Sequence, residues 1–431
     1  FFFYLSFMLS LNYIRENPRE VAERLAVKNF DGSALIAKII ELDQSRRDTQ
    51  KKLDDLQARG NAIAREIGVL FQQGKPAEAG SLRDQTTAIK AESKELDAAL
   101  EAVRKDLDDI LVRIPNLPHA TVPPGRSADD NEVVANGGEP LPAEPGAVPH
   151  WDLAARYDII DFNTGTKITG AGFPLYKGQG ARLQRALINF FLDRAAEAGY
   201  TEVQPPYMVN AASAYATGQL PDKDAQMYHV GLDDLYLIPT AEVPVTNIYR
   251  DTILNLRDLP VKNTAYSACF RREAGSYGKD VRGLNRLHQF DKVEIVQVTH
   301  PDHSYQVLEE MRDYVAGLLA QLELPYRVVR LCGGDMSFTS ALTYDMEVWS
   351  SAQGRWLEVS SVSNFEAFQA NRLKLRFKDE QGKMVTAHTL NGSALALPRI
   401  MAALLENNQT PDGIRIPAAL IPYTGFDRIG S

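Results

Sequence analysis

The chain has 431 residues, and 47 Lys and Arg against 56 Asp and Glu give a formal net charge of −9. This length suggests two or three domains, and a hydrophobic fraction of 44% excludes wholesale disorder. The acidic balance argues against a protein that coats nucleic acid through bulk charge, but it allows a local nucleic-acid surface. Two cysteines, Cys269 and Cys332, are too few for a disulfide framework or a thiolate metal site, and they indicate a reducing compartment.

The N-terminal tip is apolar but short. Residues 1–11 fall far below the roughly 20 residues that span a bilayer, and no Lys or Arg precedes them as in a signal peptide. We interpret Phe1 to Phe7 as an appendage, with the natural start at Met8. Elsewhere the sequence has no segment that reads as transmembrane, so we expect no membrane partner.

Residues 31–114 favour helix and contain a single proline, Pro76. Apolar residues alternate at spacings of four and three, filling eight of eleven positions from Leu35 to Leu70 and eight of ten from Leu82 to Ile114. This is a heptad seam, and the Gly/Pro break between its halves predicts an antiparallel helical hairpin. An oligomerisation zipper or a spacer would show the same periodicity. With 13 basic and 15 acidic residues over 33–112, charge does not mark the arm as nucleic-acid binding.

A proline-rich connector follows, with eight prolines between Pro115 and Pro149, which predicts extended, irregular chain. From Trp151 onward, an amphipathic helix at about 180–198 is mixed with β-branched, alternating runs. The expected strands are residues 265–271, 286–298, 326–331, 343–349 and 355–359. Such runs with short turns predict an antiparallel sheet flanked by helices, an α+β fold.

The common nucleotide and hydrolase signatures are missing: there is no GxxxxGK[ST], no GxGxxG after a strand, no HExxH and no G-x-S-x-G. His300 and His303 flank a proline without nearby thiolates, so a loop or helix start is favoured over a metal site. Asp335, Asp345 and Glu347 are interpreted as structural.

The segment from Phe270 to Phe290 is more informative. Two strands joined by a glycine-rich, charged loop are expected to place Arg271 and Glu273 on one face. Arg271 is a bidentate donor suited to phosphate, Glu273 can accept from an exocyclic amine, and Phe290 offers a plane for stacking a base. An Arg–Glu cross-strand pair on a solvated hairpin is the alternative for this segment taken alone.

Together with Gly199–Pro206 and Asn391–Arg399, this segment resembles the three signature motifs of class II aminoacyl-tRNA synthetases. The closer resemblance is to the seryl-tRNA synthetase family. Leu237–Glu242 is similar to its serine-binding segment, Phe270–Glu294 to its motif 2, and Glu358–Asn364 to another of its hallmarks. The resemblance covers essentially Met8 to the C-terminus and includes the arm, which corresponds to the family's tRNA-binding domain.

The resemblance implies an ATP-dependent ligase that converts L-serine to seryl-adenylate and transfers the seryl group to the 3′ end of tRNA(Ser), and also of tRNA(Sec) where an organism has one. It further implies Mg²⁺, a homodimer with Pro205–Pro206 near the dimer interface, and a cytoplasmic location. The expected organisation is a tRNA-binding domain at 8–114 with a coiled-coil arm, a connector at 115–150, and a catalytic domain with a class II antiparallel sheet at 151–431.

The residue roles also follow from the resemblance. Arg271 and Arg399 would be catalytic. Serine would be bound by Thr240, Ala241, Glu242, Glu294 and Ser393. ATP would be bound by Arg271, Arg272, Glu273, Arg286, Leu287, Phe290, Glu358, Val359, Ser360, Ser361 and Arg399. Glu358 and Ser361 would hold Mg²⁺.

The third motif departs from the family pattern, because Ala394 and Pro398 stand where glycines are common. Pro398 is compatible with the first turn of a helix that presents Arg399.

Two other functions remain open from the sequence. A relative that loads an amino acid onto a carrier protein has no evident need for the long arm. A catalytically silent RNA-binding or coiled-coil scaffold would not need to retain Arg271, Glu294 and Arg399.

Overall fold

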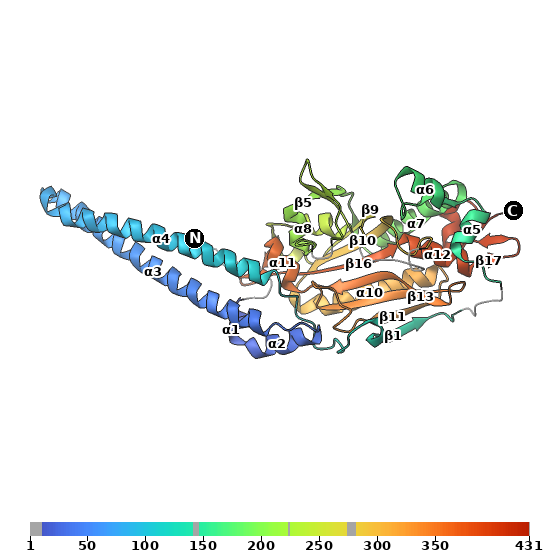
Figure 1. Cartoon of the computed structure of the whole chain (residues 1–431), viewed down its shortest axis with the longest axis horizontal. Helices are drawn as coiled ribbons and strands as arrows, with labels where there is room; N and C mark the ends of the chain where they lie inside the picture. Colours follow the sequence, from blue (N-terminus) through green and yellow to red (C-terminus); the bar gives the residue numbers. More distant parts are fainter. Residues whose placement is uncertain (1–10, 141–145, 223–224, 274–281, 431) are drawn as a thin grey trace. The chain divides into compact units, whose positions relative to one another are not determined.

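The computed structural model describes residues 11–140, 146–222, 225–273 and 282–430 (Figure 1). The chain divides into two compact units. One is formed by residues 9–26 and 30–115, and the other mainly by residues 116–431 with 27–29. The interpretation of Phe1 to Phe7, and most of the glycine-rich loop after Glu273, lie outside the described residues.

The first unit is a helical hairpin, as the heptad seam predicts. Its elements are α1 (Leu11–Glu16), α2 (Pro18–Val27), α3 (Ser33–Gln72), the 3₁₀ helix η1 (Pro76–Ala79) and α4 (Gly80–Leu111). Helices α3 and α4 lie side by side over their length. The buried seam side chains include Ile39, Leu53, Ile89 and Leu107. Because these residues occupy the predicted positions, the hairpin is stabilised by one apolar stripe from each helix.

A buried carboxylate joins α3 to α1. Asp43 is 1% exposed, and its carboxylate lies 2.9 Å from Arg15 Nη1 and 2.7 Å from Arg46 Nη2. A buried carboxylate is costly unless it is paired, and two guanidinium groups satisfy it here. Arg46, which interrupts the apolar seam in the sequence, is therefore one half of an ion pair.

The second unit is built on an eight-stranded sheet with strand order β1-β11-β12-β13-β16-β10-β9-β4. Its strands are β1 (Glu132–Gly137), β4 (Thr201–Glu202), β9 (Val261–Phe270), β10 (Gln289–Thr299), β11 (Tyr326–Arg330), β12 (Leu342–Ser350), β13 (Arg355–Asn364) and β16 (His388–Ala396). All neighbours pair antiparallel except β4 and β9. The predicted α+β class with an antiparallel sheet is confirmed.

Helices and small sheets surround the large sheet. The helices are α5 (His150–Arg156), α6 (Phe162–Ile168), α7 (Gly178–Glu197), α8 (Ala211–Thr217), α9 (Glu242–Asn247), α10 (Ser304–Gln321), α11 (Ala367–Leu373), α12 (Leu397–Asn407) and α13 (Ile421–Thr424), with 3₁₀ turns η2 (Ala128–Asp130), η3 (Leu256–Asp258), η5 (Pro301–His303) and η6 (Ala418–Leu420). The short strands are β2 (Ile160–Asp161), β3 (Leu175–Tyr176), β5 (Met208–Asn210), β6 (His229–Val230), β7 (Leu235–Leu237), β8 (Ile253–Asn255), β14 (Arg376–Lys378), β15 (Met384–Thr386), β17 (Gln409–Thr410), β18 (Gly413–Arg415) and β19 (Arg428–Ile429).

The two faces of the sheet have different roles. Apolar side chains from α7, α10 and α12 form one core with strand residues that include Val293 and Ile295 of β10. Their neighbours Lys292 and Glu294 point to the other face, where they line a cavity. Since successive side chains of a strand alternate, the same strand contributes to the core and to the site.

Two expectations about strands were wrong in detail. The proline-rich connector is not irregular throughout, because residues 132–137 form β1 and pair with β11 at the edge of the sheet. Strand β16 was not expected, although it lies between β10 and β13. Its residues 388–396 are fully or partly buried on both faces, so the sequence lacks the polar–apolar alternation that identified the other strands.

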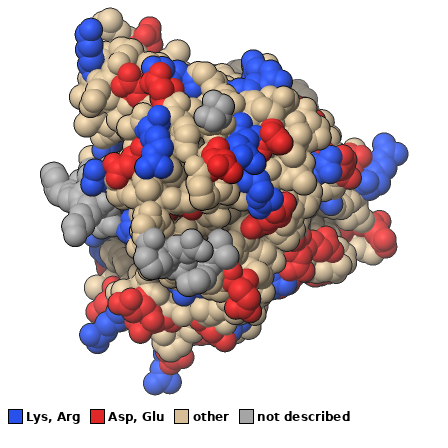
Figure 2. Space-filling model, turned by 90° about the vertical axis from the view of Figure 1, so that its right-hand side faces the viewer, with Lys and Arg blue, Asp and Glu red and all other residues tan. Residues whose placement is uncertain are grey.

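Charges of both signs are interspersed on the face drawn in Figure 2, and neither sign forms a continuous field there. This agrees with the modest net charge of −9. Among the described residues, no helix is long and apolar enough to cross a membrane.

The arm provides a test of the packing. Leu107 is fully buried in the seam, so we expect Leu107→Ala to destabilise the hairpin by about 2–5 kcal/mol. Amide hydrogen exchange of α3 and α4 would measure the loss. Lys105→Ala, two residues before Leu107 at an exposed position of the same helix, is the matched control. Equal exchange rates in the two variants would contradict the seam packing.

Candidate active site

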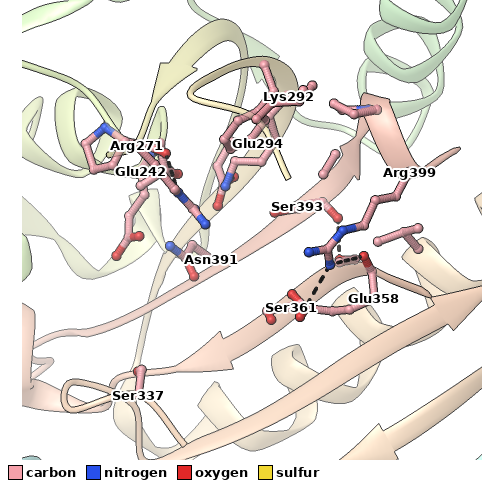
Figure 3. Close-up of a pocket in the computed structure, with 18 of the residues that line it drawn as sticks. Glu242, Arg271, Lys292, Glu294, Ser337, Glu358, Ser361, Asn391, Ser393 and Arg399 are labelled. Atoms are coloured by element: carbon pink, nitrogen blue, oxygen red, sulfur yellow. Dashed lines mark hydrogen bonds and ion pairs between the residues drawn. The ribbon is translucent and has the colours of Figure 1, made fainter. Parts of the chain in front are cut away.

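A cavity of about 530 Å³ opens on the polar face of the sheet. It brings together the predicted residues Thr240, Glu242, Arg271, Glu273, Arg286, Leu287, Phe290, Glu294, Glu358, Val359, Ser360, Ser361, Ser393 and Arg399. In Figure 3 the labelled side chains, which include those of Glu294, Glu358 and Ser393, converge from β10, β13, β16 and the loops beside them. Two predicted residues do not line it. Ala241 is packed among apolar residues, and Arg272 lies over the ring of Tyr228.

Arg271 follows the last residue of β9. Its backbone N–H donates to His288 O (3.0 Å), and its Nε donates to Pro239 O (3.2 Å). Its guanidinium carbon lies 5.3 Å from the centroid of the Phe290 ring. These contacts hold the side chain over an aromatic plane and leave its terminal nitrogens available to an anion.

The strand argument for Glu273 was wrong. Strand β9 ends at Phe270, and Glu273 has a left-handed backbone with φ of 48°. Its carboxylate accepts from Arg286 Nη1 at 3.1 Å. Arg271 and Glu273 therefore do not reach the cavity through strand alternation, because both follow the end of β9, where the backbone is no longer that of a strand. The Arg–Glu pair that the sequence left open is present, and it lies in the cavity wall.

Glu242 is the first residue of α9 and is 8% exposed. One of its oxygens accepts from Gln369 Nε2 at 2.6 Å. Burial, and next the negative charge of Glu294, raise the pKa of Glu242 to about 7. The cavity therefore holds a carboxyl group that a cationic ligand would ionise.

Glu294 lies on β10 opposite Ser393 of β16 and is 2% exposed. Its carboxylate forms an ion pair with Lys292 Nζ at 2.5 Å. Lys292 offsets the charge of one of two neighbouring buried carboxylates, which would otherwise repel each other. Ser393 also lines the cavity, and its backbone carbonyl accepts from Ser360 Oγ at 2.5 Å.

Arg399 lies in the first turn of α12, after Pro398, where proline's missing N–H has no cost. The expectation for Pro398 is thus confirmed. Arg399 Nε donates to Asn285 O (3.1 Å), and Nη1 donates to Glu358 O (2.7 Å). These bonds fix the guanidinium at the mouth of the cavity.

Glu358 and Ser361 lie on β13. Ser361 Oγ donates to Asp345 Oδ1 of β12 at 2.5 Å. Burial, and next the charge of Glu358, raise the pKa of Asp345 well above its usual range. Asp345 was interpreted from the sequence as structural. In the structure it is a buried hydrogen-bond acceptor for Ser361, a residue of the cavity wall.

The sequence reasoning missed other lining residues, which are Gln219, Gln226, Pro239, Leu284, Asn285, Lys292, Ser337, Thr339, Ser363, Phe365, Asn391, Ala396 and Pro398. Period-two alternation carried a signal for some of them. Phe290, Lys292 and Glu294 share one face of β10, and Asn391 shares one face of β16 with Ser393. Loop residues such as Ser337 had no periodic signal.

Two family models match the chain. The "Seryl-tRNA synthetase N-terminal domain" matches residues 8–118, and the "tRNA synthetase class II core domain (G, H, P, S and T)" matches residues 228–408. The serine–tRNA ligase of Salinibacter ruber is 52% identical over 426 residues, which cover 98% of this chain and 100% of that protein. The serine–tRNA ligase of Chlorobium luteolum is 48% identical, covering 98% and 99%.

Solved structures of seryl-tRNA synthetases are also similar to this chain. The seryl-tRNA synthetase of Pyrococcus horikoshii, complexed with ATP, superposes with a TM-score of 0.92 at 36% identity, covering 98% of this chain and 99% of that one. The cytoplasmic serine–tRNA ligase of Naegleria fowleri, in complex with AMP, gives 0.88 at 28% identity, with 98% of each chain covered. The antiparallel sheet and its cavity are those of a class II aminoacyl-tRNA synthetase. Within that class, the chain belongs to the seryl-tRNA synthetase family, and the predicted ligase class is confirmed.

The raised pKa of Glu242 predicts a pH-dependent stability. Between the ordinary value of 4.5 and about 7, the unfolded chain releases this proton while the folded protein retains it. The contribution of Glu242 to stability is therefore fully present below pH 4.5 and is lost as the pH rises to about 7. We expect the unfolding temperature of the wild type, relative to Glu242→Gln, to fall over this interval and to level off above it. A constant difference from pH 4 to pH 8 would contradict the assignment.

Proposed function

We propose that this cavity activates L-serine with ATP and then serves the transfer of the seryl group to tRNA(Ser). In the first step an oxygen of the serine carboxylate attacks the α-phosphorus, a new P–O bond forms, and pyrophosphate leaves. In the second step the 3′-terminal ribose hydroxyl displaces AMP. The observation that carries the proposal is one cavity that holds two buried carboxylates together with three arginines.

The two buried carboxylates suit the ammonium and hydroxyl groups of L-serine. Glu242 and Glu294 can accept from an ammonium and a hydroxyl group, and Thr240 and Ser393 add hydroxyls. Ala241 would contribute only through its main chain, since it is buried among apolar residues. A site whose polar groups are satisfied by the substrate hydroxyl can reject alanine by roughly 10⁴–10⁵. Rejection of threonine would instead be steric, because the serine pocket would have no room for its additional methyl group.

The arginines suit the phosphates of ATP. Arg271 would bind the α-phosphate, and Arg286 and Arg399 the outer phosphates. The attacking carboxylate is already ionised, so the site needs no general base, and orientation and charge stabilisation supply the rate. Arg271 and Arg399 would therefore be the catalytic residues.

The base would stack on Phe290, with Glu273 and the main chain at Leu287 at its edge. Val359 and Ser360 line the same part of the wall. Arg272 donates through Nε to Met227 O at 3.0 Å, so its role in ATP binding would be indirect.

Glu358 and Ser361 would hold Mg²⁺. In the described part of the chain, no three His, Cys, Asp or Glu side chains are grouped to hold a metal by themselves. This suits Mg²⁺, which typically takes one or two carboxylates and completes its shell with phosphate oxygens and water. Burial, and next the charge of Glu358, raise the pKa of Asp345, and carboxylates crowded in this way fit a divalent cation. When bound, Mg²⁺ would neutralise phosphate charge.

The remaining proposals concern partners and location. The helical hairpin, matched by the family's N-terminal domain, would bind tRNA(Ser), and tRNA(Sec) where it exists. The protein would be a cytoplasmic homodimer, with Pro205–Pro206 near the interface. Cys269 and Cys332 are both free and buried, which suits a reducing compartment. We retain the proposed division into residues 8–114, 115–150 and 151–431.

The function is tested by ATP–pyrophosphate exchange with each amino acid, followed by charging of total tRNA. We expect exchange with serine and esterification of tRNA(Ser), with no exchange above background for alanine. Absence of serine-dependent exchange would overturn the proposal. Exchange without tRNA charging would favour a ligase that loads a carrier protein.

The serine pocket is tested by Glu294→Ala. The change removes an acceptor for the substrate and leaves Lys292 without its 2.5 Å partner, so we expect kcat/KM for serine to fall by on the order of 10²-fold or more. Glu310→Ala, at an exposed position on α10, is the control. Wild-type exchange by Glu294→Ala would refute the pocket assignment.

A further inference from the structure

The segment that begins at Arg282 is held by the start of α5. The guanidinium carbon of Arg282 lies 4.6 Å from the ring centroid of Trp151. Gly283 has φ of +66°, and a Cβ at that position would lie 2.2 Å from His150 Nε2. The next residue, Leu284, donates its backbone N–H to His150 Nε2 at 2.9 Å. Three consecutive residues therefore contact two side chains of α5.

His150 is 0% exposed, and its ring is satisfied on both sides. Nδ1 lies 2.7 Å from Glu406 Oε1, and Nε2 accepts from Leu284 N–H. Because Nε2 is an acceptor, the ring is neutral with its proton on Nδ1, which donates to Glu406. If Nε2 carried a proton, its N–H would face the N–H of Leu284, and the two donors could not form a hydrogen bond. The imidazole of His150 thus connects the carboxylate of Glu406 to the backbone N–H of Leu284.

Glu406 is the centre of this network. It lies near the end of α12, whose first turn carries Arg399, and it also accepts from Ser350 Oγ and from Gln353 Nε2 (3.1 Å). His150, Ser350 and Gln353 thus all donate to this one carboxylate. Hydrogen bonds to a carboxylate are stronger than those between neutral groups.

A second connection reaches the same segment. Gln353 Oε1 accepts from Asn285 Nδ2 at 3.1 Å, and Asn285 O accepts from Arg399 Nε at 3.1 Å. Glu406 thus holds residue 284 through His150 and residue 285 through Gln353. Asn285, Arg286 and Leu287 then line the cavity, whereas His150, Gln353 and Glu406 do not.

We propose that His150 and Gln353, both bonded to Glu406, are positioning residues that set the main chain of residues 284–287 for ATP. The inference rests on the proposed function, which assigns Arg286 and Leu287 to ATP. It adds that the segment is fixed from behind, by a network anchored on the same helix that presents Arg399. The carboxylate of Glu406 then fixes the segment 284–287 relative to the helix that carries Arg399.

Two substitutions of His150 separate positioning from simple packing. A Gln side chain extends as far as Nε2, so His150→Gln can still accept from Leu284 N–H. An Asn side chain extends only as far as Nδ1, so His150→Asn keeps a donor to Glu406 but loses that acceptor. We expect His150→Asn to raise KM for ATP by on the order of 10-fold or more in serine-dependent exchange, with KM for serine changed less than twofold. His150→Gln should lie within about threefold of the wild type.

Gln353→Ala tests the second connection at a partly exposed turn, where folding is not at risk. Its expected effect is a smaller rise in KM for ATP alone, and Gln381→Ala, at an exposed position elsewhere, is the control. If both His150 variants fail to fold, Gln353→Ala decides. An unchanged KM for ATP in the folded variants, or equal losses for ATP and serine, overturns the inference. No exchange by the wild type would instead overturn the proposed function, and this inference with it.

Discussion

The alternation of side chains across one antiparallel sheet is the constraint on which the rest of the second unit depends. On β10, Val293 and Ile295 are packed with the helices, and Lys292 and Glu294 line the cavity. Strand β16 divides its residues in the same way, with Leu390 in the core. The backbone of a strand fixes the face of the sheet toward which each side chain points, so packing of the apolar residues against the helices also sets which side chains face the cavity.

Buried charge is the cost of this arrangement, and each charge is offset by a different partner. Glu294 has Lys292, Glu242 has the amide of Gln369, and Glu406 has an imidazole. The offset is incomplete for Glu242 in the cavity wall and for Asp345, the hydrogen-bond partner of Ser361, because burial, and next a second carboxylate, raises the pKa of each group. An ammonium group and a divalent cation are the ligands that such a surplus of negative charge favours. The electrostatics of the site thus agree with a family whose members act on serine and ATP.

Much of the fold could be predicted, because it is encoded in local periodicity. The hairpin followed from a seam in which Leu107 and similar residues recur every three or four positions, and five strands followed from alternating runs. Strand β16 was missed because it is buried on both faces. The left-handed backbone at Glu273 was missed because such a conformation outside glycine has no reliable sequence signal. At the site, Arg271 and Arg399 were identified through the resemblance, and their residue roles stay proposals.

The sequence by itself determined the class of protein, the two helices of the arm and the segments that carry the site. These features depend on the spacing of residues that are close together in the sequence. Only the tertiary structure decided which carboxylates share a cavity, that Lys292 neutralises one of them, and that His150 meets both Leu284 and Glu406. The two contacts of His150 join residues more than 100 positions apart, and the shared face of Lys292 and Glu294 needs a strand to define it. No periodicity relates such distant residues, and only the packing of α5 and α12 brings them within hydrogen-bonding distance.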